Sequence, residues 1–212
     1  MRKFFGYTLA EVLITLGVIG VVAAMTLPTV INKYQKSVVE TRLKNFYSTI
    51  NQALQRYVAE NGDLEPLELK NYTYNENKIW LEQHILPYIK YKNVKACNHS
   101  GNVACVYLNN GDSFNFSVDT NGGGLSFCIK CDAGAGIINS RKKFAFEIYR
   151  ISTGNIIGSK NFIEPYTFIW DGTINHLKNH KRYGCRKDSQ TFNFCTKYIQ
   201  LNNWKIPDDY PW

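Results

Sequence analysis

The stretch from Tyr7 to Ile31 constrains this chain more than any other part of its sequence. It reads YTLAEVLITLGVIGVVAAMTLPTVI, and Glu11 is its single charged residue. About 20 consecutive apolar residues are enough for a helix to cross the hydrocarbon core of a bilayer. The run is apolar on every side, unlike a surface helix, which keeps one polar face. The sequence therefore predicts a transmembrane helix over residues 7–31.

Two simple interpretations of this helix leave Glu11 unexplained. A cleaved secretory signal sequence fits the basic Arg2 and Lys3 ahead of the span, with a weak cleavage site near Ala23 and Ala24. A plain single-span anchor fits the length. In either case a lone carboxylate inside the bilayer costs about 2.5–3.5 kcal/mol. We therefore expect a partner that neutralises Glu11.

A third interpretation accounts for the carboxylate. The leader, residues 1–6, is short and basic and ends in Gly6, and Tyr7 follows it. Glu11 lies four residues beyond Tyr7, and Pro28 lies near the outer end of the apolar run. This arrangement resembles the N-terminus of type IV pilin-like proteins, which are the pilins of pili and the pseudopilins of type II secretion systems. Tyr7 stands where phenylalanine is usual.

The resemblance implies a route of processing and assembly. A prepilin peptidase would cut after Gly6, and the new amine of Tyr7 would be methylated. Glu11 would pair with such an amine, usually on a neighbouring subunit, which supplies the missing counter-charge. The implied partners are other pilin or pseudopilin subunits, the peptidase and an inner-membrane assembly platform. The implied location is the bacterial inner membrane, single-pass, with the head in the periplasm or outside the cell, and a filament after assembly.

The region after the span, residues 32–61, has the pattern of an amphipathic helix that continues the first one. Its apolar residues recur at spacings of four and three: Val39, Leu43, Phe46, Ile50, Ala53 and Tyr57. Asn61 and Gly62 are a typical helix end. We expect a kink at Pro28, because proline removes a backbone donor and clashes with the preceding turn. Packing of the apolar stripe on the chain's own sheet is preferred to a coiled coil.

Residues 62–212 are predicted to form a globular α+β head. A loop is expected over 64–77 and a short helix over 78–89. Alternating apolar residues predict antiparallel strands with one buried face, at 103–108, 113–118, 143–151 and 192–201. Residues 118–122 (VDTNG), the glycine-rich loop expected after them and residues 142–150 also resemble a sheet segment of some pseudopilin-like proteins. The tail 195–212 resembles a C-terminal closure of related proteins. The expected fold is pilin-like.

Six cysteines in a membrane-anchored chain favour disulfides in an oxidising compartment. They fall into three local pairs, but spacing alone does not select among the possible connectivities. For the last pair the resemblance supports a C-terminal disulfide loop. Zinc binding and a thioredoxin-like role are weaker alternatives, because one CxxC spacing occurs without a second and without a helix start beside it. The local pairs are Cys97 with Cys105, Cys128 with Cys131, and Cys185 with Cys195.

Other polar groups are weaker candidates for a site. Asp112, Asp119 and Asn121 offer hard oxygen ligands of the kind calcium prefers, although a turn in which the last two bond their own backbone is the commoner meaning. His176 and His180 are spaced like metal ligands on a helix, but a solvated basic loop is the preferred interpretation. That loop would carry Lys178, Lys181, Arg182, Arg186 and Lys187 with Tyr183.

The chain of 212 residues has a formal net charge of +8 and a pI near 9.1. A basic balance permits nucleic acid as a partner without identifying it. No P-loop or GxSxG motif occurs, so no enzyme activity and no cofactor are predicted. The predicted function is a structural subunit of a type IV pilus-like or type II secretion pseudopilus filament. The alternatives are a DNA-binding minor pilin for DNA uptake, which would use the basic loop, and a membrane-anchored binding domain.

Overall fold

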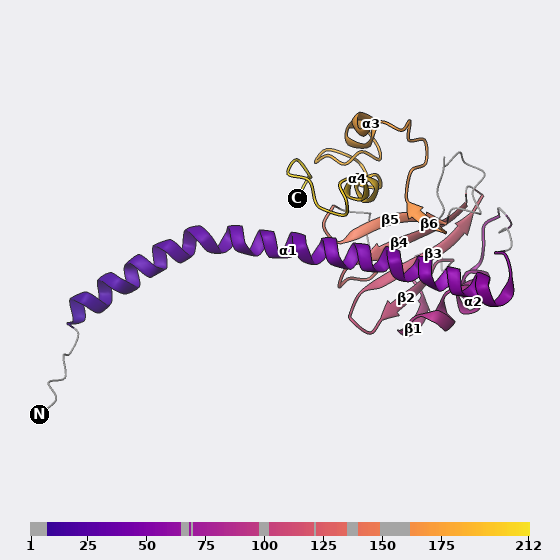
Figure 1. Ribbon diagram of the computed structural model, residues 1–212, viewed down its shortest axis with the longest axis horizontal. Coiled ribbons are helices and arrows are strands. Elements are labelled where there is room, and N and C mark those ends of the chain that lie inside the picture. The colour runs from indigo at the N-terminus through magenta and orange to yellow at the C-terminus, as the bar shows by residue number, and fades with distance from the viewer. Residues whose placement is uncertain are drawn as a thin grey trace, which may run out of the picture. The chain divides into compact units, whose positions relative to one another are not determined.

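The computed structural model describes residues 8–64, 68, 70–97, 102–120, 122–134, 140–148 and 162–212. The chain divides into two compact units, residues 1–38 and 39–212. Helix α1 (Leu9–Asn61) begins in the first unit and ends in the second (Figure 1). A long N-terminal helix followed by an antiparallel sheet is the predicted α+β fold.

Helix α1 has a different character in each unit. In the first unit its apolar side chains are exposed, for example Leu13 and Ile19. In the second unit its stripe is buried against the head, and it includes Val39, Leu43, Phe46, Ile50, Ala53 and Leu54. This confirms the amphipathic interpretation of the outer half. Pro28 lies inside the helix, where it denies the Ala24 carbonyl its usual donor; the kink stays a prediction.

The sheet of the second unit has six antiparallel strands, each paired with the next along the chain (Figure 1). The two residues between β3 and β4 make the tightest of these connections, and antiparallel neighbours permit such short links. The strands are β1 (Tyr91–Ala96), β2 (Ala104–Leu108), β3 (Ser113–Asp119), β4 (Gly122–Cys128), β5 (Lys143–Ile148) and β6 (Ile163–Pro165).

One face of the sheet carries the core. Phe114, Phe116, Phe127, Phe144 and Phe146 are almost fully buried. The Phe46 ring of α1 stacks on Phe127 with 4.2 Å between centroids and 11° between planes. Such aromatic contacts contribute about 0.5–1.5 kcal/mol each beyond the burial of apolar area. The alternation that predicted strands 113–118 and 143–151 is confirmed here as far as Ile148; residues 149–151 lie outside the described part of the chain.

Short helices flank the sheet. Helix α2 (Tyr74–His84) starts with a capping box between Thr73 and Glu76, and the 3-10 helix η1 (Leu86–Tyr88) follows it. Together they confirm the helix expected over 78–89, although α2 begins earlier because Thr73 supplies its cap. The remaining helices are α3 (Ile174–Asn179) and α4 (Cys195–Leu201).

The strand predicted over 192–201 is wrong, because α4 occupies most of this range. Phe194, Cys195, Tyr198 and Ile199 lie on one helical face, with spacings of one, three and one residues. Phe194, Cys195 and Ile199 are fully buried. The aromatic and β-branched residues resemble a strand in composition, but their spacing is helical.

The glycine-rich loop expected after residues 118–122 is also wrong, because these glycines begin strand β4. Glycine is unfavourable in strands when taken alone. Here β4 pairs with β3 on one side and with β5 on the other, and Gly122 adopts φ +140° opposite Asp119. Pairing of all three glycines with β3, and of Gly124 with β5 as well, therefore overrides the local preference.

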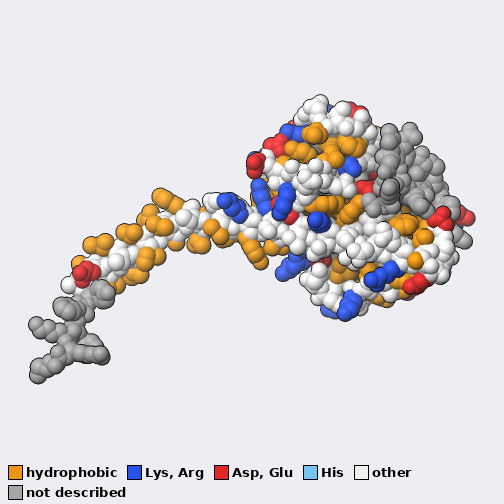
Figure 2. Space-filling view, viewed as in Figure 1, with side chains coloured by type: hydrophobic (Ala, Val, Ile, Leu, Met, Phe, Trp, Pro, Cys, Tyr) orange, Lys and Arg blue, Asp and Glu red, His pale blue; other side chains and the backbone are white. Residues whose placement is uncertain are grey.

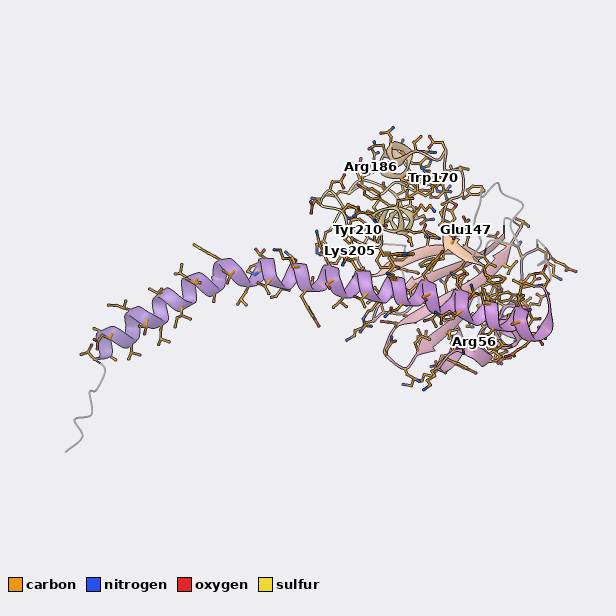
Figure 3. The ribbon with its side chains drawn as sticks, viewed as in Figure 1. Arg56, Glu147, Trp170, Arg186, Lys205 and Tyr210 are labelled. Atoms are coloured by element: carbon orange, nitrogen blue, oxygen red, sulfur yellow. A yellow bond between two sulfur atoms is a disulfide. The ribbon has the colours of Figure 1, made fainter. Side chains whose placement is uncertain are left out.

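The C-terminal tail contacts helix α1. Glu40 of α1 accepts two hydrogen bonds, from Lys205 Nζ at 2.9 Å and from the backbone N–H of Ile206 at 2.9 Å. The Trp204 ring lies 4.8 Å from that of Tyr47. These contacts join the end of the chain to the beginning of the head, and Figure 3 shows Lys205 beside α1.

Candidate functional site

The predicted processing site, Gly6 and Tyr7, lies outside the described residues. The first described residue, Thr8, is the N-cap of α1 and forms a capping box with Glu11. The Glu11 Oε2 atom accepts hydrogen bonds from Thr8 N at 2.8 Å and from Thr8 Oγ1 at 2.9 Å, and Glu11 N donates to Thr8 Oγ1 at 3.2 Å. The box fixes the carboxylate at the first turn of the helix, and Glu11 follows Tyr7 by four residues in the sequence.

The head contains a nearly identical box, which shows what Glu11 lacks. Glu76 Oε2 accepts from Thr73 N at 2.8 Å and from Thr73 Oγ1 at 2.9 Å. In addition, Lys70 Nζ lies 3.3 Å from Glu76 Oε1 and supplies a cation. Within the described residues, Glu11 has hydrogen-bond donors but no ion-pair partner. Donors orient a carboxylate but leave its net charge in place.

The segment that follows Glu11 is long and apolar enough to cross a membrane. The apolar window lies near the N-terminus and none of it is buried within the protein. Figure 2 shows hydrophobic side chains along the visible face of this segment. Exposed apolar patches larger than a few hundred Å² are rare on soluble monomers. The first unit therefore has the surface of a membrane-spanning helix.

Three disulfides join the cysteines in the predicted local pairs. Their Cα–Cα distances are 5.7 Å for Cys97–Cys105, 5.4 Å for Cys128–Cys131 and 4.7 Å for Cys185–Cys195. The first two bonds lie near each other beside Ala133. The third joins the segment after α3 to the first residue of α4 and is buried in the main core. It thereby holds the C-terminal part of the head together.

The calcium candidates do not converge on one site. Asp112 precedes β3 and Asp119 ends it, so roughly 20 Å of strand separates them. Asp112 is buried, and its carboxylate is occupied by Arg42 Nη1 at 2.5 Å, Lys130 N at 3.0 Å and Asn110 Nδ2 at 2.9 Å. Asn121 lies outside the described residues.

His176 lies in helix α3 and His180 is its C-cap, so the loop interpretation is corrected for residues 174–179; residues 181–187 lie outside helices and strands, as predicted. Thr173 caps α3, and its Oγ1 accepts from His176 N at 3.1 Å, so the helix has a local start signal. Both Nδ1 atoms accept backbone hydrogen bonds, from Asp171 N at 3.1 Å for His176 and from Tyr183 N at 3.0 Å for His180. Among the described residues, no group of three or more His, Cys, Asp or Glu is placed to hold a metal.

Most of the basic side chains beside this helix already form ion pairs or lie over an aromatic ring. Lys178 forms an ion pair with Asp209. Arg186 Nε lies 3.0 Å from Asp188 Oδ1, and the Arg182 guanidinium lies 5.2 Å above the Tyr183 ring. Within the part of the chain that the structure describes, Lys181 and Lys187 form no such contacts. A surface that binds nucleic acid needs several available cations. This basic cluster is therefore a weak candidate for a nucleic-acid interface.

The chain matches one family model over residues 29–212, and that family is described as one of unknown function (DUF6613). The match covers most of the chain. The protein belongs to DUF6613. No curated protein and no solved structure matches it.

The DUF6613 match begins at Thr29, immediately after Pro28. It therefore includes the buried stripe of α1, the sheet, the three disulfides and the C-terminal tail. The most specific part of the pilin-like resemblance, at the N-terminus, lies before the match, whereas the resemblances at residues 118–122, 142–150 and 195–212 lie within it. The family match therefore covers a head of unknown function and leaves out the apolar segment that carries Glu11.

Sequence reasoning missed two features that the structure brings together. The Thr8–Glu11 box had a signal, because threonine followed three residues later by glutamate is a capping signature. Glu147 and Tyr166 line a cavity with residues of other elements, and no local pattern in the sequence marks them. Their juxtaposition depends on the order of strands in the sheet.

Proposed function

We propose that this DUF6613 protein is a structural, non-enzymatic subunit of a type IV pilus-like or type II secretion pseudopilus filament. A prepilin peptidase cuts it between Gly6 and Tyr7. The apolar helix first anchors the monomer in the bacterial inner membrane, single-pass, with the head on the periplasmic side. It later becomes part of the filament core, while the head supplies the outer surface.

The observation that carries this proposal is the state of Glu11. Its carboxylate is oriented by Thr8, yet it lies at the start of an apolar segment with no ion-pair partner among the described residues. Cleavage before Tyr7 creates an amine on the residue next to Thr8. In a bundle of such helices, the amine of one subunit neutralises the carboxylate of another. Charge neutralisation in a medium of low dielectric constant then sets the register between subunits.

The experiment combines processing with polymerisation in the bacterial host. Mass spectrometry of the wild-type N-terminus is expected to show a chain that starts at Tyr7 and is methylated. In the variant Glu11→Val, membrane insertion is preserved or slightly favoured, because the substitution removes a charged side chain from the membrane-spanning segment. Filament incorporation is expected to fall at least tenfold, because the neighbouring amine is then buried without a counter-ion.

Glu76→Val is the matched control, since it removes the same kind of capping box from α2 in the head. It is expected to leave processing and incorporation near wild type. A chain that starts at Met1 would favour the anchored binding domain, and one that starts near Ala24 would favour a signal sequence. Glu11→Val subunits that enter sheared filaments as well as wild type would show that Glu11 does not set register.

A further inference from the structure

A cavity of about 240 Å³ opens on the sheet face opposite the aromatic core. Gly122–Gly124 of β4 form its floor, between Ser117 and Asp119 of β3 on one side and Glu147 of β5 on the other. The pairing register places Ser117, Gly124 and Glu147 in one row across the three strands. Side chains alternate along a strand, so this row faces away from Phe116, Leu125 and Phe146 in the core. Figure 3 labels Glu147 on β5.

The floor is open because it lacks side chains. A Cβ atom added to Gly124 would meet no heavy atom within 4 Å. Valine is favoured in strands over glycine, so folding alone does not require glycine here. A larger residue would project into the cavity rather than into the core.

Glu147 lines the cavity and is held there by Thr167. Its Oε1 atom accepts hydrogen bonds from Thr167 N at 3.0 Å and Thr167 Oγ1 at 2.7 Å. Among the described residues, no hydrogen bond reaches Oε2. Burial raises the pKa of Glu147, the neighbouring Glu164 carboxylate raises it further, and Lys197 opposes that change. Two carboxylates thus share one nearby ammonium group.

Three aromatic rings form the wall opposite the floor, and they are tilted around the cavity. Tyr166 lies 6.3 Å from Phe168 at 45° and 5.7 Å from Tyr183 at 59°. The rings are therefore tilted relative to one another and do not form a single flat platform of the kind on which a sugar ring stacks. Aromatic faces are electronegative and attract cations.

A strained turn holds this wall in place. The N–H of Trp170 donates to the Thr167 carbonyl at 2.9 Å, and Ile169 within the turn has φ +59°. A β-branched residue in the left-handed region is a genuine outlier and costs about 1–2 kcal/mol. Strain of this kind is retained most often at functional sites. The same turn also positions Thr167 against Glu147.

We propose that this cavity binds a compact organic cation with an alkylammonium group. Among the described residues, its lining combines two carboxylates, Asp119 and Glu147, with three aromatic rings and includes no lysine or arginine, and the Arg182 guanidinium lies over the Tyr183 ring. This is notable because the whole chain has 25 Lys and Arg against 17 Asp and Glu. The volume suits a small headgroup, since drug-sized ligands occupy about 300–1,000 Å³. The cation is carried either by a free methylated amine or by a lysine side chain of another protein.

This inference does not depend on the proposed filament. It is tested with the full-length protein in phosphatidylglycerol nanodiscs, which present no choline headgroups, by ligand-observed NMR titration. The probes are choline and its neutral isostere 3,3-dimethylbutanol, together with N-acetyl-lysine methylamide and its norleucine analogue. Each cation is compared with its neutral partner, which separates charge recognition from hydrophobic contact.

The cation is expected to bind at least tenfold more tightly than its neutral partner. Tighter binding of choline would identify a free amine as the source, and tighter binding of the lysine derivative would identify a protein chain. Glu147→Gln and Gly124→Val are each expected to weaken the better cation at least tenfold, the first by removing charge and the second by filling space. Glu82→Gln, an exposed control on α2, is expected to change nothing.

Equal binding of a cation and its neutral isostere would overturn the proposal, as would a cation affinity that neither cavity variant changes. Thermal unfolding of Gly124→Val checks that the strand still forms. Should that variant fail to fold, Glu147→Gln and the two probe pairs decide the question alone.

Discussion

Asn51 offers the sharpest test of how the head is held together. It lies on α1, is 5% exposed, and its side chain makes four hydrogen bonds. Oδ1 accepts from Phe162 N at 2.8 Å and from Ile163 N at 3.0 Å. Nδ2 donates to the carbonyl of Tyr47 at 3.0 Å and to that of Ile163 at 3.4 Å. One amide thus ties the start of β6 to the helix.

The substitution Asn51→Leu keeps the branching at Cγ and raises the helix propensity, but it removes all four bonds. Each bond contributes about 1 kcal/mol net, and a buried backbone N–H without an acceptor costs about 1–3 kcal/mol. Burying the leucine returns about 1.5–3 kcal/mol. We therefore expect the free energy of unfolding of the head to fall by about 2–4 kcal/mol.

Pulse proteolysis of the full-length protein in detergent, across a urea series, measures this change. Gln52→Leu is the matched control, because Gln52 is exposed on the next position of the same helix and bonds only Ser48 at 2.9 Å. It is expected to change stability by less than about 0.5 kcal/mol. Equal stability of the two variants would refute the claim that the buried amide fastens β6 to α1.

Three further predictions concern the head. Replacing both Cys185 and Cys195 by serine is expected to destabilise it by about 2–4 kcal/mol, and non-reducing peptide mapping of the wild type is expected to show these two joined to each other. Burial raises the pKa of Glu147 above its unfolded value near 4.5, so the folded head binds this proton more tightly than the unfolded chain does. The contribution of Glu147 to stability is therefore complete below pH 4.5 and is lost as pH rises through the raised pKa. The free energy of unfolding of Glu147→Gln is expected to show no such fall with pH. Ile169→Gly is expected to stabilise the folded head by up to about 1 kcal/mol in the same assay, because the relief of left-handed strain exceeds the entropy cost of glycine.

Local periodicity was a good guide where one face of an element decides its structure. The stripe that includes Leu43, Phe46 and Ile50 predicted the outer half of α1, and alternation through Phe114 and Phe116 predicted β3. Burial of one face imposes a period of 3.6 or 2 on the sequence, so the pattern can be read without the fold.

Local reasoning failed where a partner distant in sequence decides the outcome. The glycines of β4 form a strand because all three pair with β3 and Gly124 also pairs with β5. Nothing in the local sequence distinguishes Asn51 from other polar residues. Its hydrogen-bond partners lie at β6, more than 100 positions away. The error at residues 192–201 is different, since the helical spacing was present and the composition was misleading.

The sequence by itself determined that this chain carries an apolar N-terminal helix with one carboxylate at its start, because about 20 uncharged residues suit a bilayer whatever the rest of the chain does. It also indicated the outer helix and the strands β2, β3 and β5, but not β1, β4 or β6. Only the tertiary structure decided which residues share the cavity around Glu147, since strand order and a strained turn bring Asp119, Gly124 and Tyr166 together. Contacts between distant segments depend on how the whole sheet is paired, and local spacing does not encode that pairing.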